Sequence, residues 1–407
     1  GLNLSGSDGR RRFYQQYLTP TGAATGEDST QRQITDQANT GWNARLNYDR
    51  AVVSDKTSLS MGSFINRNSN EIITDASYLR KSDQTEQALD NLSNNLKFFQ
   101  TVWNLRMGIN HKFSQHNRLS VGVSAEQTAI GFDLRKTSKH VSNSYWTWLP
   151  YANFNQNFND KLNLSLAYRR SIRRPGINEL NPTIDFSDPY TIRFGNEKLE
   201  ASTSDNFDLV VGRTRAKAYF NLGMGYNKVR DIYSRVRTLL EDGKTQVTWE
   251  NISGRQEYEV STWSGVTITN RWKLNVSAGY TYNKYSKFDI AVNKYRNGGS
   301  FTSNMNTSVI PNDRWNFTTG ITFNRFSNPQ GFGRWTTGMN FGVQHKIMKK
   351  RLILTVNAID PFVQNRNFSK TYGPRFYLEN NSINRTRNFR LTIGYNLINP
   401  KPAKMKS

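Results

Sequence analysis

The chain has 407 residues and is strongly basic, with 55 Lys and Arg against 31 Asp and Glu and a formal net charge of +24. Hydrophobic residues make up 36% of it, the mean hydropathy is −0.72, and no segment approaches the roughly 20 continuous apolar residues that a spanning helix needs. The absence of cysteine excludes a disulfide framework and a thiolate metal site.

The first residues, 1–6, already alternate between apolar and polar side chains, as in the middle of a strand. No signal peptide stands before them. We therefore expect a fragment or part of a mature protein, with the signal and any N-terminal region missing. Further on, the polar segment 82–95 predicts a short helix capped by Ser82 or Asp83.

Runs in which every second residue is apolar recur through the rest of the chain. Because side chains alternate between the two faces of a strand, each run predicts a strand with one apolar and one polar face. The last run, 389–397, has a wholly apolar face. Such repetition predicts an all-β fold, an antiparallel transmembrane outer-membrane β-barrel of about sixteen strands, and no linker divides residues 1–407. The longest run consists of Trp272, Leu274, Val276, Ala278, Tyr280 and Tyr282.

Some connections between runs are short and others are long. Outer-membrane barrels show the same difference, with short periplasmic turns and long outer loops. Trp272 and Trp315 follow short connections, which predicts an aromatic girdle at the periplasmic interface. The short connections are 54–56, 159–160, 270–271, 311–313 and 349–350, and the long ones are about 68–100, 129–144, 172–203, 284–298 and 361–386.

The sequence offers no catalytic constellation, so we expect no enzyme, no cofactor and no metal site. The four histidines stand in no metal-ligand spacing, and His345 continues an apolar run, which indicates an interfacial histidine. Basic residues are scattered over polar strand faces and turns, which disfavours a nucleic-acid partner. They include Arg45, Arg106, Arg169, Lys273 and Arg390.

The stretch 168–203 is the most unusual part of the chain. Pro175, Pro182 and Pro189 each fix φ and remove a donor, so they predict an ordered loop after a strand. The arginines at its start suit carboxylates or phosphates, or they pair with acids of neighbouring loops. These arginines are Arg169, Arg170, Arg173 and Arg174.

This stretch resembles the barrel signature of TonB-dependent receptors, in particular the Bacteroidetes-type outer-membrane β-barrel family related to them. Two residues depart from the family pattern, since Glu197 and Ala201 stand where proline is usual or common. Both affect the stiffness of the loop. The matching residues are Tyr168, Arg169, Arg174, Pro175, Leu180, Asn181, Pro182, Asp188, Pro189, Gly195, Asn196 and Leu199.

The resemblance implies that this chain is the C-terminal part of a 22-stranded barrel whose N-terminal plug is missing here. It also implies uptake of a scarce solute with energy supplied through TonB in the bacterial outer membrane. A non-transporting barrel subunit of an outer-membrane complex is one alternative, with a surface lipoprotein or other subunits as partners, and a passive porin is another.

Recognition is expected in the outer loops, because long connections on a rigid barrel carry binding residues. The net charge favours an anionic ligand over a cationic one. The same arginines could instead contact lipopolysaccharide phosphates in the surrounding outer-membrane lipid. The candidate contacts are Arg173, Arg174, Arg193, Arg366 and Arg375.

Overall fold

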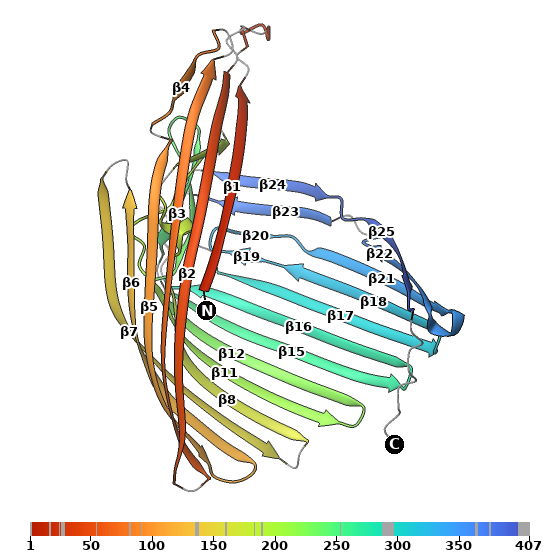
Figure 1. Ribbon diagram of the computed structural model, residues 1–407. Helices are drawn as coiled ribbons and strands as arrows, with labels where there is room; N and C mark the ends of the chain where they lie inside the picture. The colour runs from red at the N-terminus through yellow and green to blue at the C-terminus, as the bar shows by residue number, and fades with distance from the viewer. Residues whose placement is uncertain are drawn as a thin grey trace. The chain divides into compact units, whose positions relative to one another are not determined.

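The computed structural model describes residues 2–15, 18–23, 25, 29–53, 55–80, 83–90, 92–134, 138–158, 161–182, 184–188, 190–252, 254–286, 297–362, 365–373 and 376–397 (Figure 1). Strands dominate it. One sheet has 17 strands, of which β4 has only three residues, so sixteen are long, in agreement with the predicted number. None of the helices among the described residues is long and apolar enough to cross a membrane.

The strands of the large sheet are β1 (Leu2–Gln15), β2 (Ser29–Val53), β3 (Thr57–Arg80), β4 (Glu86–Ala88), β5 (Asn94–Lys112), β6 (Asn117–Leu134), β7 (Lys139–Phe158), β8 (Leu162–Arg173), β11 (Ser202–Arg215), β12 (Ala218–Arg230), β15 (Arg255–Thr269), β16 (Trp272–Tyr285), β17 (Gly298–Asn312), β18 (Trp315–Arg325), β21 (Thr336–Ile347), β22 (Leu352–Ile359) and β25 (Asn388–Tyr395).

Two smaller sheets are built from connections between strands of the large sheet, and they include segments at 233–251 and 327–333 that were not predicted as long connections. The first contains β13 (Tyr233–Leu239), β14 (Thr245–Asn251), β10 (Thr191–Arg193) and β9 (Asp185–Asp188). The second contains β19 (Ser327–Asn328), β20 (Gly331–Gly333), β23 (Asn365–Tyr372) and β24 (Tyr377–Asn384). The helices are α1 (Ile177–Leu180) and the 3-10 turn η1 (Met348–Lys350).

The chain divides into two compact units. Unit 1 comprises Gly1–Asn153, Tyr168–Asp205 and Val229–Ser253. Unit 2 comprises Phe154–Ala167, Asn206–Lys228 and Gly254–Ser407.

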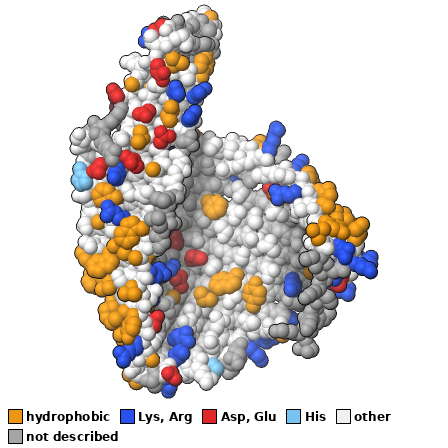
Figure 2. Space-filling model, viewed as in Figure 1, with side chains coloured by type: hydrophobic (Ala, Val, Ile, Leu, Met, Phe, Trp, Pro, Cys, Tyr) orange, Lys and Arg blue, Asp and Glu red, His pale blue; other side chains and the backbone are white. Residues whose placement is uncertain are grey.

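In unit 1 the apolar residues change from one face of the sheet to the other partway along the strands. On β5, Leu105 and Met107 are exposed, whereas Leu96 and Phe98 are buried. The exposed pair has odd numbers and the buried pair even numbers, so they lie on opposite faces. One half of β5 thus offers an apolar face to lipid, and the other half covers a protein core. Figure 2 shows hydrophobic side chains gathered over the strands of unit 1.

Indole rings lie near this change of face. Trp103 on β5 and Trp146 on β7 are exposed, and their rings meet edge to face with centroids 5.9 Å apart. Tryptophan favours the level where a membrane meets water, because its ring is apolar and its N–H needs a partner. The Trp103 N–H donates to Ser63 Oγ at 3.2 Å.

Unit 2 keeps antiparallel pairing from β15 to β25, with register shifts only near the turns, at Thr267/Thr269 and Val309/Asn312. β16 pairs antiparallel with β15 and β17, and the antiparallel chain continues through β18, β21, β22 and β25. Val276 and Tyr280 of β16 are exposed on its apolar face. Trp272 donates to Thr307 Oγ1 at 2.9 Å, and Trp315 stacks on His345 with ring centroids 3.9 Å apart.

Some predicted boundaries were wrong. The segment 82–95 contains no helix in its described residues, because Glu86–Ala88 pairs with the end of β3 instead, and Ser82 lies outside the described residues. The connections predicted at 68–100 and 129–144 are shorter, since β3 and β6 run on to Arg80 and Leu134. Pro311 belongs to β17, and the turn follows at 313–314.

Candidate functional site

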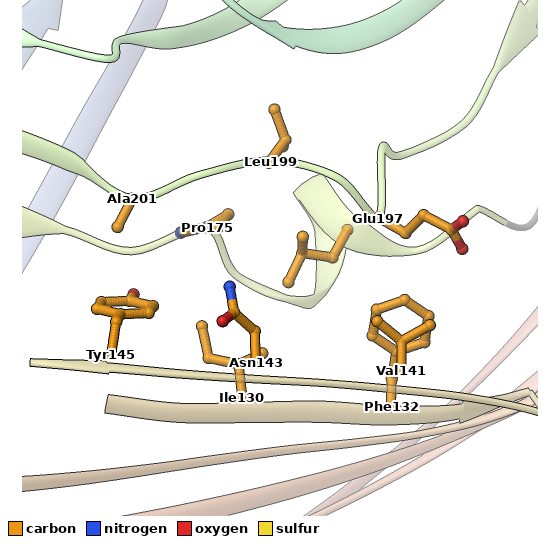
Figure 3. Close-up of a pocket in the computed structure, with 10 residues that line it drawn as sticks. Ile130, Phe132, Val141, Asn143, Tyr145, Pro175, Glu197, Leu199 and Ala201 are labelled. Atoms are coloured by element: carbon orange, nitrogen blue, oxygen red, sulfur yellow. The ribbon is translucent and has the colours of Figure 1, made fainter. Parts of the chain in front are cut away.

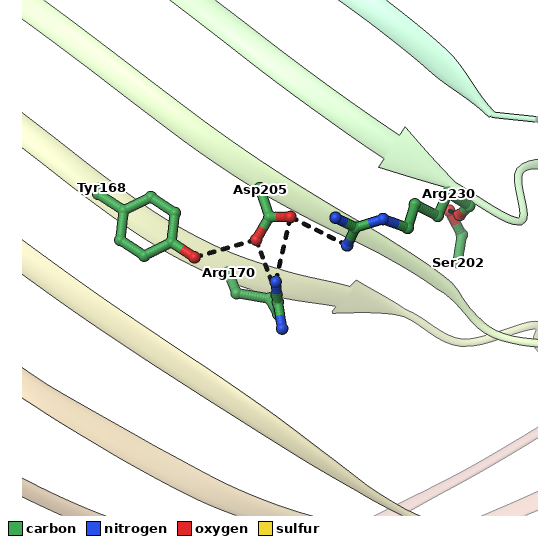
Figure 4. Close-up of polar contacts among 5 residues, drawn as sticks. All are labelled: Tyr168, Arg170, Ser202, Asp205 and Arg230. Atoms are coloured by element: carbon green, nitrogen blue, oxygen red, sulfur yellow. Dashed lines mark hydrogen bonds and ion pairs between the residues drawn. The ribbon is translucent and has the colours of Figure 1, made fainter. Parts of the chain in front are cut away.

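A buried carboxylate holds the two strands that flank the unusual stretch, whose residues 174–201 we call the signature loop. Asp205 on β11 accepts hydrogen bonds from Tyr168 Oη at 3.0 Å and from Arg170 Nε at 2.7 Å, both on β8 (Figure 4). Arg230 at the end of β12 adds an ion pair at 3.0 Å. Because the Asp205 side chain is 9% exposed, its charge depends on these partners. They keep the entry and the exit of the loop together.

Arg174 anchors the start of the signature loop to β6. Its guanidinium forms an ion pair with the buried carboxylate of Glu126, and its Nε donates to Thr128 Oγ1 at 2.9 Å. Its backbone carbonyl accepts a hydrogen bond from Tyr233 Oη at 2.8 Å. Arg174 therefore pairs with an acid of a neighbouring segment, which was the alternative to a ligand contact.

Apolar side chains of the loop complete the core of unit 1. Leu180 and Leu199 are buried against β5 and β6, and Pro175 is fully buried. Figure 3 shows Pro175 and Leu199 facing Ile130 and Tyr145 across a cavity of about 30 Å³. That volume suits about one water molecule, so the cavity is a packing defect and no solute site. The core comprises Leu96, Phe98, Ile130, Phe132, Leu134, Leu180, Leu199 and Tyr233.

Backbone hydrogen bonds join the signature loop to the β13–β14 hairpin. β10 pairs in parallel with β14, and Asn196 Nδ2 donates to the Trp249 carbonyl at 2.9 Å. Within the loop, the Gly195 amide donates to the Asn181 carbonyl at 2.6 Å, and the Asn196 amide donates to that of Glu179 at 2.7 Å. The loop and the hairpin form one ordered body, which we call the loop module.

Gly195 sits where no side chain fits. A Cβ at this position would lie 2.6 Å from the backbone of both Asn181 and Glu179, and backbone cannot move aside cheaply. We expect Gly195→Ala to destabilise the loop module by about 1–3 kcal/mol. Hydrogen exchange of the peptide covering residues 177–200 should quicken, whereas Gly9→Ala on β1, where a Cβ would make only an ordinary contact, should leave that peptide unchanged. Unchanged exchange in Gly195→Ala would contradict the close approach.

Arginines stack on aromatic rings along one face of the hairpin. The Arg173 guanidinium lies 4.6 Å from the centroid of the Tyr233 ring, and that of Arg235 lies 5.1 Å from the Trp249 ring. The two rings contact each other edge to face at 6.1 Å. Stacking leaves the edge N–H groups of a guanidinium able to donate to a carboxylate or phosphate.

Two more arginines join this face through the strand register. Arg193 and Arg237 are the partners of Val247 on its two sides, so they share a row of the sheet. Burial, and then the charges of Arg235 and Arg193, lower the pKa of Arg237. Burial and the two neighbouring cations thus both act against the charged form of Arg237. We call the set the arginine face: Arg173, Arg193, Arg235 and Arg237, with Tyr233 and Trp249.

The structure places the other candidate residues separately. Arg366 lies on β23 in unit 2, and Arg375 and Pro189 lie outside the described residues. Asp188 ends β9, and Pro182 follows α1. No group of three or more His, Asp or Glu suited to a metal ion occurs among the described residues. Sequence reasoning missed Glu126, Asp205, Arg235 and Arg237, since their partners are distant in sequence or lie in a hairpin that was not predicted.

Comparison with known proteins identifies the protein family that contains this large sheet. The model of the outer membrane protein beta-barrel family matches residues 2–395. No curated protein matches the sequence. Among solved structures, the copper transporter OprC aligns with a TM-score of 0.64 and 10% identity, covering 97% of this chain and 62% of its own.

Two further structures share the fold. The ferric citrate transporter FecA in the unliganded form aligns with a TM-score of 0.62 and 10% identity, over 96% of this chain and 59% of its own. BauA, the ferric preacinetobactin receptor from Acinetobacter baumannii, aligns with a TM-score of 0.56 and 10% identity, over 97% and 60%. The chain therefore spans about three-fifths of the length of these proteins.

Proposed function

The chain belongs to the outer membrane protein beta-barrel family and lies in the bacterial outer membrane, and from this premise we propose that it is the barrel wall of a TonB-dependent-receptor-like transporter. We propose the Bacteroidetes-type group on the strength of the signature loop. Residues 1–407 then form one portion of the barrel, surrounded by outer-membrane lipid and lipopolysaccharide. TonB, acting through an N-terminal plug region, supplies the energy.

The arginine face is the observation that carries the choice of solute. Three guanidinium groups lie on the loop module and a fourth, that of Arg173, lies at the end of β8; two of the four are stacked on aromatic rings that limit their motion. A pre-ordered arginine loses less conformational entropy when it binds than a free one does. The solute is therefore anionic, with carboxylate or phosphate groups, and the net charge of +24 draws it toward the chain.

Solute depletion tests this function. Cells with the full-length protein and cells lacking it are grown in the same medium, with and without a protonophore, and mass spectrometry compares what each removes. We expect at least one anionic solute to be depleted only when the protein and the proton gradient are both present. Arg193→Gln with Arg235→Gln should reduce its uptake by about tenfold or more, since charge-assisted hydrogen bonds contribute about 1.5–3 kcal/mol each.

Lys284→Gln with Arg385→Gln is the matched control, because it removes the same charge from exposed positions of unit 2 that do not belong to the arginine face. This control should keep normal uptake. Depletion that resists the protonophore would instead indicate a passive porin. Identical depletion by all the strains, together with stoichiometric co-purification of other outer-membrane proteins, would support a non-transporting subunit.

A further inference from the structure

The short turns at one end of unit 2 carry a concentration of positive charge that the transport proposal does not use. Arg271 lies in the β15–β16 turn and Arg314 in the β17–β18 turn, while Lys349 and Lys350 lie in η1. These turns are neighbours, because the Ile310 amide donates to the Arg271 carbonyl at 2.7 Å and the Lys346 amide donates to that of Arg314 at 2.8 Å.

A single described acid, Asp313, sits within this group of turns. Lys350 Nζ lies 2.9 Å from its carboxylate. The hydrogen bond and charge of Lys350, with the charges of Arg271 and Lys346, lower the pKa of Asp313. The cations thus outnumber the acid in one small area. We call the set of cations in and next to the turns the cationic rim: Arg271, Arg314, Lys349, Lys350 and Arg351.

Exposed apolar side chains lie directly beside the cationic rim. Trp272, Trp315 and Met348 are exposed, and Trp315 stacks on Phe317 with centroids 5.8 Å apart. Figure 2 shows Lys and Arg side chains next to hydrophobic ones at the right of the view, where Figure 1 draws the turn between β21 and β22. Cations above an aromatic girdle match a lipid, whose phosphate lies above its acyl chains.

The η1 turn has an unusual backbone. Met348, Lys349 and Lys350 have φ of 50°, 55° and 73°, and none of them is glycine. Left-handed backbone is unfavourable for residues that carry a Cβ, and three in a row are rare. Such strain persists where surrounding contacts maintain it, and it often marks functional segments. Here the turn carries two exposed lysines directly after an exposed methionine.

We propose that the cationic rim binds anionic phospholipid headgroups of the membrane leaflet at the short-turn end of the barrel. The phosphate accepts hydrogen bonds from Arg271, Arg314 and Lys349, and the acyl chains lie against Trp272 and Trp315. Short turns are periplasmic in barrels of this kind, and that leaflet consists of phospholipid. The inference goes beyond transport and does not depend on the arginine face.

Lipid selectivity of the purified full protein tests the rim. The protein is reconstituted in phosphatidylcholine bilayers with trace spin-labelled phosphatidylglycerol or phosphatidylcholine, and electron paramagnetic resonance measures the fraction of each held at its surface. We expect preference for phosphatidylglycerol. The triple variant Arg271→Gln, Arg314→Gln and Lys349→Gln should lower this preference by about fivefold or more, since each cation near the surface contributes about that factor.

The control triple variant is Lys284→Gln, Arg385→Gln and Arg387→Gln, which removes equal charge from exposed positions near the long connections of unit 2. It should keep the preference. Single Lys349→Gln serves if the triple rim variant fails to fold, and it should still lower the preference measurably. Equal loss in rim and control variants, or no loss in the rim variant, would overturn the proposal. So would complete competition by inorganic phosphate at constant ionic strength, which would indicate a site for free phosphate.

Discussion

Replacing Arg174 with Met is expected to open the loop module. The Glu126 side chain is 8% exposed, so loss of its cationic partner leaves a buried carboxylate with only the weak contacts of Asn104 and Thr128. Removing one member of a buried ion pair costs about 3–5 kcal/mol. Trypsin sites at Arg193 and Lys198 lie within the loop and report its opening. Their cleavage should become at least about a hundredfold faster, because proteolysis follows the population of the open form.

A double-mutant cycle separates the pair from general damage. Glu126→Gln should also speed cleavage, whereas Glu126→Gln combined with Arg174→Met should cost less than the sum of the two, since no unpaired charge remains. Arg173→Met is the control next in sequence. It removes the contacts of an exposed guanidinium with Tyr233, of which the cation–π contact contributes about 0.5–1 kcal/mol. Additive effects in the cycle would show that Arg174 and Glu126 do not act as a pair.

The strands were predictable where one face meets lipid. On β16 the alternation from Trp272 to Tyr282 is unbroken, and the structure pairs this whole segment with β15 and β17. On β6 the prediction ended too early. Val121 and Val123 are apolar on one face, and Ile130 and Phe132 are apolar on the other. When the apolar residues change from odd to even positions, the sequence pattern resembles the end of a strand. It can be interpreted as one continuous strand only if the loop that covers its second half is known.

The loop module was predictable only in part. Its prolines and turn residues act locally, so they predicted an ordered loop. The contacts that fix it join residues far apart, since Arg170 and Asp205 are separated by 35 positions and Arg174 and Thr128 by 46. Such pairs depend on which strands are neighbours and on the register between them. A local sequence pattern specifies neither. Arg235 and Arg237 were missed because neither strand of the short β13–β14 hairpin has a wholly apolar face, so the local pattern predicted no strand there.

Placing arginine on the lipid face of β16 should strongly destabilise the barrel. Val276 is an exposed apolar residue four positions from Trp272, near the middle of the predicted span. A tilted barrel strand needs about 9–11 residues to cross, so this position is far from either interface. Val276→Arg should lower the free energy of unfolding by about 2–4 kcal/mol, because a guanidinium at the midplane must be desolvated or must draw water and headgroups inward. The urea midpoint of the full protein in lipid vesicles measures the change.

Ser277→Arg is the matched control, one residue along the same strand. Ser277 pairs with Trp263 and Asn304, and its side chain points to the opposite, polar face of the sheet. An arginine there remains in a polar environment and should change stability by less than about 1 kcal/mol. Nitroxide labels at the two positions should differ in the same sense, with position 276 more accessible to oxygen dissolved in lipid and position 277 to a water-soluble relaxant. Equal accessibility, or equal destabilisation by the two arginines, would mean that β16 does not present Val276 to lipid, because a register slip of one residue exchanges the two faces.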